Sequence, residues 1–149
     1  MHRCGMGANA AAIADGYRTV PDAARATGGR MPYALVVGAD GTIEQSALLT
    51  DVTPHVRSWN PVAIGVGVVG DFRAAGPQVS QYDALVWLCA RLALLVGGVT
   101  RVKGHDELDG ATSWVGKRCP GEYLPMRQLR ADVRDAIPSV STVDWGIRV

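Results

Sequence analysis

The chain has 149 residues, of which 48% are hydrophobic, and its 15 lysines and arginines against 14 aspartates and glutamates leave a formal net charge of +1. A chain of this length and composition buries enough apolar surface to fold without disulfide staples, so we expect one domain over residues 1–149. The near-neutral charge excludes the strong electrostatic field by which proteins attract nucleic acid or an anionic membrane surface.

The cysteines and the first residues bear on the compartment. Cys4, Cys89 and Cys119 are an odd number at wide spacings, which is typical of a reducing compartment rather than of a disulfide framework. The N-terminal stretch MHRCGMGANAAAIADGY lacks the charged region and apolar core of a secretory signal. The most apolar run, ALVWLCARLALLVGG, is interrupted by Arg91. We therefore expect synthesis in the cytoplasm and no insertion into a membrane.

The first half of the chain predicts short helices and then strands. The alanine-rich stretch from Ala8 to Thr27 predicts one or two short helices. Three apolar runs follow, PYALVVGADG, TIEQSALL and VAIGVGVVG. The turn-forming pair Asp40-Gly41 lies between the first two, which indicates a hairpin.

A helix is predicted from Ser80 to Val96. Ser80 with Asp83 three positions later is typical of a helix start, and Gly97-Gly98 ends the pattern. Cys89 falls on the apolar stripe, where a thiol packs as a small hydrophobic group, so we do not consider it a site residue. The apolar residues recur at helical spacing: Leu85, Leu88, Cys89, Leu92, Leu95 and Val96.

After this helix, VTRVKGH predicts another short strand, and the interval from Tyr123 to Ile137 predicts a second helix that ends at Pro138. Strands mixed with helices on a short chain favour one α/β or α+β layer structure, in which helices cover a central sheet.

Two glycine-rich motifs are rejected as phosphate-binding loops. GVGVVG, from Gly65 to Gly70, has the dinucleotide-binding spacing but lies within a strand, and no helix follows it. Close packing of the strand backbone against a neighbour explains its glycines better. The stretch from Gly110 to Lys117 is one residue too long for a phosphate loop, and Arg118 stands where Ser or Thr must hold magnesium.

The segment KGHDELDGATSWVGKRCPG, residues 103–121, contains a histidine and a cysteine that could share a metal ion. The imidazole of His105 and the thiolate of Cys119 are ligands that zinc prefers. A catalytic zinc normally has three protein ligands and leaves one position open. The other two histidines, His2 and His55, are the candidates for the third ligand, and spacing does not choose between them.

GHDELDG followed by KRCPG, together with the upstream PYALVVGADGTIEQ and HVRSWNPVAIGVGVVG, resembles the zinc-dependent N-acetylmuramoyl-L-alanine amidases. This is the family of phage amidase endolysins and animal peptidoglycan-recognition proteins. The resemblance runs from about His2 to near Ile137. It implies an α/β fold, a single domain with a central mixed β-sheet flanked by helices, and a monomer whose partner is peptidoglycan, both glycan strand and stem peptide.

The resemblance also implies a His-His-Cys site for Zn²⁺. Carried over position by position, the family's zinc ligands fall on His2, His105 and Cys119. The family's tyrosine near the zinc falls on Tyr33, and the lysine two positions before the cysteine ligand falls on Lys117.

A further match concerns the substrate groove. His55, Trp59 and Asn60 match the segment that lines the groove for the glycan and the stem peptide in the family. The sequence departs from the family pattern at Ala34, because relatives often have histidine after the residue equivalent to Tyr33.

The function implied by the resemblance is that of a peptidoglycan hydrolase. Zinc-activated water would cleave the amide bond between N-acetylmuramic acid and L-alanine, while Lys117 and Tyr33 stabilise the developing negative charge. Without a leader or a wall-binding repeat, the chain resembles a phage endolysin that acts on the cell wall after release. Two alternatives stay open: a muropeptide-binding module of the same fold that does not cut, and a peptidase with Cys119 as nucleophile and His105 as base.

Overall fold

Three helices and three short strands make up the regular structure of the part of the chain that the computed structural model describes. The described residues are 10–19, 28–29, 31–56, 58–96, 101–108 and 119–141. In chain order the elements are α1 (Ala10–Thr19), β1 (Leu35–Val37), β2 (Ile43–Gln45), β3 (Val66–Val68), α3 (Val79–Leu95), the 3₁₀ turn η1 (His105–Glu107) and α4 (Met126–Ser141).

The sheet is mixed and has the strand order β2-β1-β3. β1 and β2 form an antiparallel hairpin with Leu35 opposite Gln45, and the Asp40 carboxylate accepts a hydrogen bond from the Thr42 N–H at 2.9 Å in the turn. β3 lies parallel to β1 on its other edge, with Leu35 opposite Val66. The predicted hairpin and the predicted α/β fold, a single domain with a central mixed sheet flanked by helices, are confirmed.

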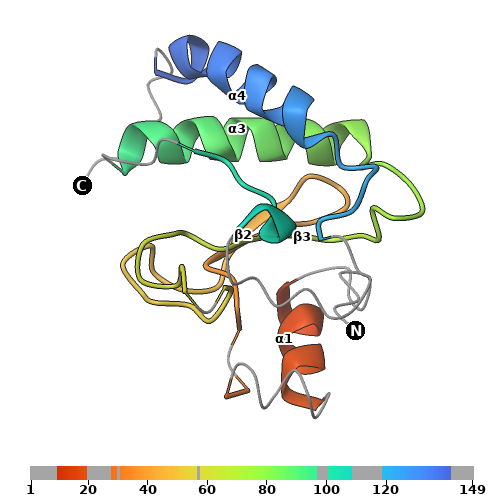
Figure 1. Ribbon diagram of the computed structural model, residues 1–149, viewed down its shortest axis with the longest axis vertical. Helices are drawn as coiled ribbons and strands as arrows, with labels where there is room; N and C mark the ends of the chain where they lie inside the picture. The colour runs from red at the N-terminus through yellow and green to blue at the C-terminus, as the bar shows by residue number, and fades with distance from the viewer. Residues whose placement is uncertain are drawn as a thin grey trace.

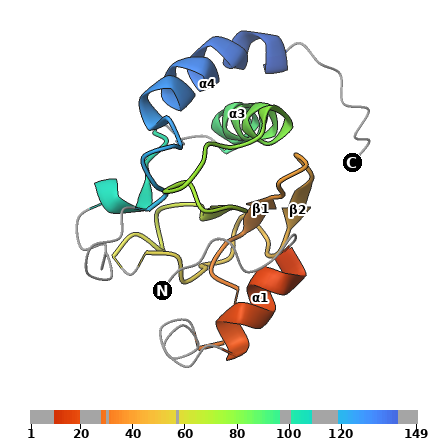
Figure 2. The same cartoon turned by 90° about the vertical axis from the view of Figure 1, so that its right-hand side faces the viewer.

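The helices lie on both sides of this sheet. α3 lies over one side, α4 packs on the outer side of α3, and α1 lies beyond the opposite side of the sheet (Figures 1 and 2). All three residues of β1 are buried, as expected for a strand with layers on both faces. The core between the sheet, α3 and α4 is formed by Leu35, Val37, Phe72, Leu85, Leu88, Cys89, Ala90, Leu92, Leu124, Leu129 and Val133.

A buried glutamine fixes α3 to the sheet. Gln81 is 2% exposed, and its side-chain amide donates to the carbonyl oxygen of Val69 at 2.7 Å and, over 3.4 Å, to that of Val37. Buried polar groups are rarely left without partners, and here the carbonyl oxygens that follow β3 and end β1 serve as acceptors. The helix is thereby held at the edge of the sheet from which the chain leaves both parallel strands.

The first long helix differs slightly from its prediction. α3 spans Val79–Leu95, so Ser80 lies inside the first turn, and Gln78 precedes the helix without a side-chain capping bond. The predicted helix start at Ser80 is therefore wrong by one residue, whereas the burial of Cys89 is confirmed. Among the described residues, no helix has both the length and the apolar character needed to cross a bilayer.

The predicted strand VTRVKGH is wrong for its described part, because residues 101–104 have no strand structure. The carbonyl oxygen of Val102 accepts a bond from the Arg130 side chain, and the Gly104 N–H donates to the Glu107 side chain. Side chains rather than a neighbouring strand thus satisfy this backbone. α1 falls within the stretch predicted to be helical, Ala8–Thr27, of which residues 8–9 and 20–27 lie outside the described residues.

The second long helix starts later and ends later than predicted. The Tyr123 N–H donates to the carbonyl oxygen of Phe72 at 2.8 Å, and Pro125 disfavours helical backbone at Leu124, so α4 begins only at Met126. Pro138 does not end it, and the helix continues to Ser141. A proline has no backbone N–H, so the helix lacks one hydrogen bond at Pro138. Because Pro138 lies in the last turn, few helical residues follow it, and the helix continues past the missing bond.

Candidate functional site

His105 is the first residue of η1, and hydrogen bonds on both sides fix its backbone. The Gly104 N–H donates to Oε2 of Glu107 at 2.8 Å, and the Glu107 N–H donates back to the Gly104 carbonyl oxygen at 3.1 Å. The His105 carbonyl oxygen accepts a bond from the Leu108 N–H at 3.3 Å. The turn is therefore closed around His105 by its own neighbours.

Cys119 lies directly against this turn. The Asp106 N–H donates to the carbonyl oxygen of Cys119 at 3.0 Å. On the other side of His105, a Cβ atom at Gly104 would come within 2.9 Å of Cδ of Pro120, so the two segments approach as closely as a glycine permits. The structure thus brings together the backbones of His105 and Cys119, the two residues of the predicted metal site that it describes.

The Cys-Pro-Gly turn is anchored on the loop that follows β3. Gly121 has a φ of 115°, and a Cβ atom there would lie 2.5 Å from the carbonyl carbon of Phe72, a distance that no side chain could occupy. The Tyr123 N–H donates to the Phe72 carbonyl oxygen at 2.8 Å. Phe72 is itself only 3% exposed, so the turn that carries Cys119 rests on a buried residue of the core.

Tyr33 lies just before β1, and its ring packs on the backbone of β3. A Cβ atom at Gly67 would lie 2.6 Å from Cδ2 of Tyr33. β1 and β3 are hydrogen-bonded parallel neighbours, so the side chain of a residue just before β1 can reach the backbone of β3. The prediction that the GVGVVG glycines serve close packing is confirmed here.

His55 packs in the same way on the residue before β3. A Cβ atom at Gly65 would lie 2.8 Å from Cγ of His55. Nδ1 of His55 lies 2.9 Å from the carbonyl oxygen of Thr53. A carbonyl oxygen only accepts hydrogen bonds, so this contact requires that Nδ1 carries the proton. Nε2 is fully buried and has no hydrogen-bond partner among the described residues. In the neutral ring this nitrogen carries a lone pair that can accept a hydrogen bond.

Both described histidines are biased toward the neutral form. Burial lowers the pKa of His55, the Thr53 carbonyl opposes this by raising it, and the nearby charge of His105 lowers it again. Burial also lowers the pKa of His105, against an opposing effect of Asp106. The influence of one ring on the other places the two imidazoles in one electrostatic neighbourhood. Neutral imidazole is the form that binds metal ions.

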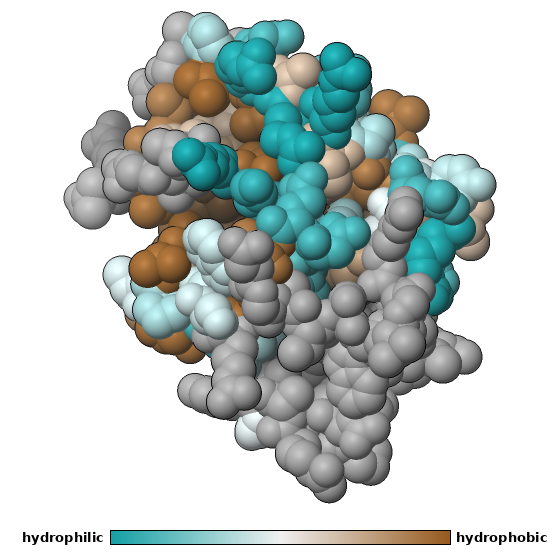
Figure 3. All heavy atoms as spheres, in the orientation of Figure 1, coloured by the Kyte–Doolittle hydropathy of each residue, from teal (hydrophilic) through white to brown (hydrophobic). Residues whose placement is uncertain are grey.

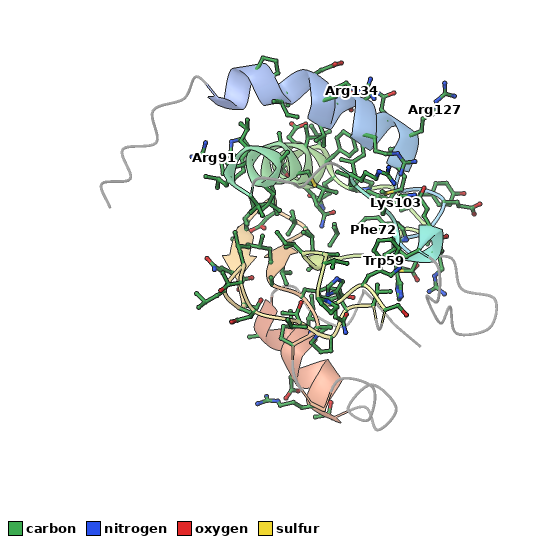
Figure 4. All side chains as sticks on the ribbon, turned by 60° about the vertical axis from the view of Figure 1, so that its left-hand side comes forward. Trp59, Phe72, Arg91, Lys103, Arg127 and Arg134 are labelled. Carbon is green, nitrogen blue, oxygen red and sulfur yellow. The ribbon has the colours of Figure 1, made fainter. Side chains whose placement is uncertain are left out.

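Trp59 and Asn60 belong to a tight loop before β3. Oδ1 of Asn60 accepts a hydrogen bond from the Val56 N–H at 2.7 Å, and the Asn60 N–H donates to the Val56 carbonyl oxygen at 2.9 Å. The side chain of Asn60 thus shapes the loop, a role that the sequence analysis did not assign to it. Trp59 lies on the same side of the molecule as η1, together with Phe72 and Lys103 (Figure 4).

Two residues of the predicted site, His2 and Lys117, lie outside the described residues. Within the part of the chain that is described, no three His, Cys, Asp or Glu side chains are arranged to hold a metal ion, the set of His55, His105 and Cys119 included. The choice of a third ligand therefore stays a prediction.

Glu107 and Arg130 were not among the predicted site residues. Arg130 of α4 donates to Oε1 and Oε2 of Glu107 at 3.1 and 2.8 Å. The only sequence signal was the carboxylate two positions after His105. Its partner lies far along the chain, and nothing in the local pattern of α4 distinguishes Arg130 from its neighbouring arginines.

Comparison with known proteins gives two findings. The family model described as N-acetylmuramoyl-L-alanine amidase matches residues 1–122, a range that includes every predicted site residue but not Arg130. A stretch of 52 residues is 36% identical to peptidoglycan-recognition protein 2 of Holotrichia diomphalia. That stretch covers 35% of this chain and 28% of the relative, so less than a third of the relative's length is matched.

Proposed function

Because the chain belongs to the N-acetylmuramoyl-L-alanine amidase family, we propose that it hydrolyses the amide bond between N-acetylmuramic acid and L-alanine in peptidoglycan. The observation that carries the proposal is the hydrogen bond from the Asp106 N–H to the Cys119 carbonyl oxygen. It holds the backbones of a histidine turn and a cysteine, fourteen positions apart in the chain, side by side. Both residues are of the types that bind zinc, and a merely structural turn needs neither.

The chemistry of the described donors fits zinc. His105 is biased toward neutral imidazole, and Cys119 is a half-buried cysteine outside any disulfide. In the proposal these two residues and His2 hold the ion. Zinc bound in such a site would polarise the amide carbonyl and make a water molecule reactive at neutral pH.

The chain's own residues would orient the substrate and stabilise charge. The phenol of Tyr33 would donate a hydrogen bond to the carbonyl oxygen as negative charge develops on it, and Lys117 would add an ammonium group. Loss of one such donor typically lowers the rate by about a hundredfold or more. The close contact of Tyr33 with Gly67 supports this role, because it holds the ring against the backbone of β3.

The remaining groove residues would bind the substrate. Nε2 of His55 would accept a hydrogen bond from an N–H or O–H group of the muropeptide, which would satisfy a buried nitrogen that has no partner among the described residues. Trp59 would offer an aromatic surface to the glycan. We also propose that the protein is a monomeric phage endolysin, made in the cytoplasm and acting on the cell wall after release, in keeping with the motif set that it shares with such enzymes.

Product analysis on purified peptidoglycan tests the reaction. Zinc-loaded protein should release stem peptides with new L-alanine N-termini and leave the glycan strands intact, as detected by mass spectrometry. The chelator-treated protein and the Cys119→Ser variant should release none. New reducing sugar ends, or peptides cut elsewhere in the stem, would contradict the proposal.

A second candidate is a peptidoglycan-binding module of the same fold. The name of the relative, a peptidoglycan-recognition protein, favours this candidate. Sedimentation with insoluble peptidoglycan distinguishes the two. A binding module would co-sediment equally with and without chelator and would release no peptide over extended incubation, whereas an amidase would solubilise peptide in a zinc-dependent manner.

A further inference from the structure

An ion pair connects α4 to the turn that begins with His105. Nη1 of Arg130 donates to Oε1 and Oε2 of Glu107 at 3.1 and 2.8 Å, and to the carbonyl oxygen of Val102 at 3.3 Å. In the orientation of Figure 1, hydrophilic side chains run from α4 toward the centre of the face, where η1 lies (Figure 3). Arg130 therefore contacts both the segment that enters η1 and the last residue of η1.

Glu107 passes this contact to the backbone next to His105. Its Oε2 atom, which accepts the bond from Arg130, also accepts the bond from the Gly104 N–H at 2.8 Å. A short chain of polar contacts thus runs from Arg130 through Glu107 to the peptide group before His105. Removing the Glu107 side chain would leave the Gly104 N–H, in a buried residue, without this acceptor. Removing the Arg130 side chain would take away the contact that holds the Glu107 carboxylate in place.

The same turn also determines where Cys119 lies. The Asp106 N–H that binds the Cys119 carbonyl oxygen sits between His105 and Glu107. A shift of η1 would therefore change the position of His105 and its spacing to Cys119 together. Arg130 can serve as a fixed reference, because its neighbour Leu129 is 1% exposed and anchors α4 in the core.

We propose that Arg130 and Glu107 are positioning residues of the zinc site, which hold the Gly104–His105 turn so that His105 and Cys119 meet one metal ion. This inference rests on the proposed function, because it assumes that His105 and Cys119 bind zinc. Neither residue contacts the metal in this account. Residues that orient metal ligands typically contribute about 10–100-fold in metal affinity.

Stability alone does not explain this arrangement. The side chains of Arg130 and Glu107 are 36% and 32% exposed, and ion pairs at such partly exposed positions contribute little to folding. Variants of either residue should therefore fold. The effect of their loss should fall on metal affinity instead, where a small displacement of a ligand matters.

The test compares zinc affinity across four variants, measured by competition with a chromophoric chelator. Arg130→Gln removes the guanidinium and Glu107→Ala removes the carboxylate. Glu107→Gln keeps an amide oxygen that can accept from the Gly104 N–H. Arg134→Gln is the matched control, because Arg134 is an exposed arginine further along the same helix (Figure 4). The melting temperature of each metal-free variant is measured in parallel.

Arg130→Gln and Glu107→Ala should lose about 10–100-fold in zinc affinity. Glu107→Gln should retain more affinity than Glu107→Ala, Arg134→Gln should match the unmodified protein, and all metal-free melting temperatures should agree within a few degrees. If the unmodified protein binds zinc and both Arg130→Gln and Glu107→Ala bind it equally well, the inference is wrong while the proposed function stands. If the unmodified protein binds no zinc, both fall together. An affinity loss seen only in variants whose metal-free form is unfolded also overturns the inference.

Discussion

The ring of Tyr33 lies so close to Gly67 that a single added carbon at Gly67 would sit 2.6 Å from Cδ2 of the tyrosine. His55 has the same relationship to Gly65, at 2.8 Å from Cγ. Two glycines in and beside one short strand thus leave room for two aromatic rings. The glycines at these two positions therefore serve the packing of the two rings and not the binding of a nucleotide.

Gly67→Ala should displace the tyrosine ring. An added methyl group overpacks the contact with Tyr33, and overpacking of this kind costs about 1–3 kcal/mol of unfolding free energy. In the proposed reaction the rate of peptide release should fall as well, since the phenol would no longer be aimed at the carbonyl oxygen. Denaturant unfolding and peptide release from peptidoglycan measure the two effects.

Gly76→Ala is the control for this variant. Gly76 is exposed, and the nearest atom to an added Cβ would be the Tyr123 carbonyl oxygen at 3.4 Å, an ordinary contact distance. This variant should change neither stability nor rate appreciably. If Gly67→Ala behaves like Gly76→Ala in both measurements, the ring position is not critical.

Gly121→Ala should disrupt the turn that carries Cys119. The substitution places a methyl group against the backbone of Phe72, at a φ of 115° that only glycine adopts without strain. We expect a lower melting temperature and weaker zinc binding. Gly28→Ala separates strain from crowding, because Gly28 also has a positive φ, 63°, but no atom of the described residues within 4 Å of an added Cβ. Equal losses of zinc affinity in both variants would argue against the described anchoring.

Alkylation should distinguish the two described cysteines. Burial raises the pKa of the Cys89 thiol to about 11, so at pH 8 it should stay unmodified by iodoacetamide in the folded protein. Cys119 is half-buried and should react in the metal-free protein, but should be protected when zinc is bound. Peptide mass spectrometry over a time course measures both, and urea-unfolded protein, in which both react, serves as the reference. Cys89 reacting as fast as Cys119 would contradict the described packing.

Much of the fold could be predicted because its signals are local. Apolar spacing gave α3 to within a residue, and the Asp40-Gly41 turn gave the hairpin. The failures arose where side-chain contacts, or the place of a residue within its helix, override the local preference. The sequence of residues 101–104 predicted a strand. In the structure the Val102 carbonyl oxygen accepts a hydrogen bond from Arg130 of α4, and the Gly104 N–H donates one to Glu107. Pro138 indicated a helix end, but the helix continues beyond it to Ser141.

The candidate site was predictable only in its residue types. The order of the motifs predicted His105 and Cys119 as metal ligands. The structure brings their backbones together, because the Asp106 N–H donates a hydrogen bond to the Cys119 carbonyl oxygen. The Arg130–Glu107 contact joins residues that lie far apart in the chain, so no spacing rule indicates it. That Nε2 of His55 is buried without a hydrogen-bond partner in the described part of the chain depends on the tertiary packing, which the sequence does not specify.

Acid should destabilise the metal-free protein partly through His55. Its pKa is lowered in the folded state, mainly by burial, whereas an unfolded histidine takes up its proton near pH 6.5. Stability is therefore fully present above about pH 6.5 and decreases as the pH falls below that value, because only the unfolded chain gains the proton readily. Urea unfolding at pH 7.5 and pH 5.5, with chelator present, measures the decrease.

The His55→Asn variant tests this assignment, since its amide can still donate to the Thr53 carbonyl oxygen but does not titrate. It should lose less stability between the two pH values than the unmodified protein. His105, whose pKa is also lowered, is present in both proteins, so some decrease should remain in the variant. An identical decrease in the two would show that His55 does not carry the effect.

X-ray absorption at the zinc edge tests the central claim most directly, because it reports which atoms surround the ion. The account predicts one sulfur at about 2.3 Å together with nitrogen ligands at about 2.0–2.1 Å in the zinc-loaded protein. In Cys119→Ser the sulfur should be lost, and in His105→Ala the nitrogen contribution should fall. A zinc environment without sulfur in the unmodified protein, or a sulfur that persists in Cys119→Ser, would contradict the account.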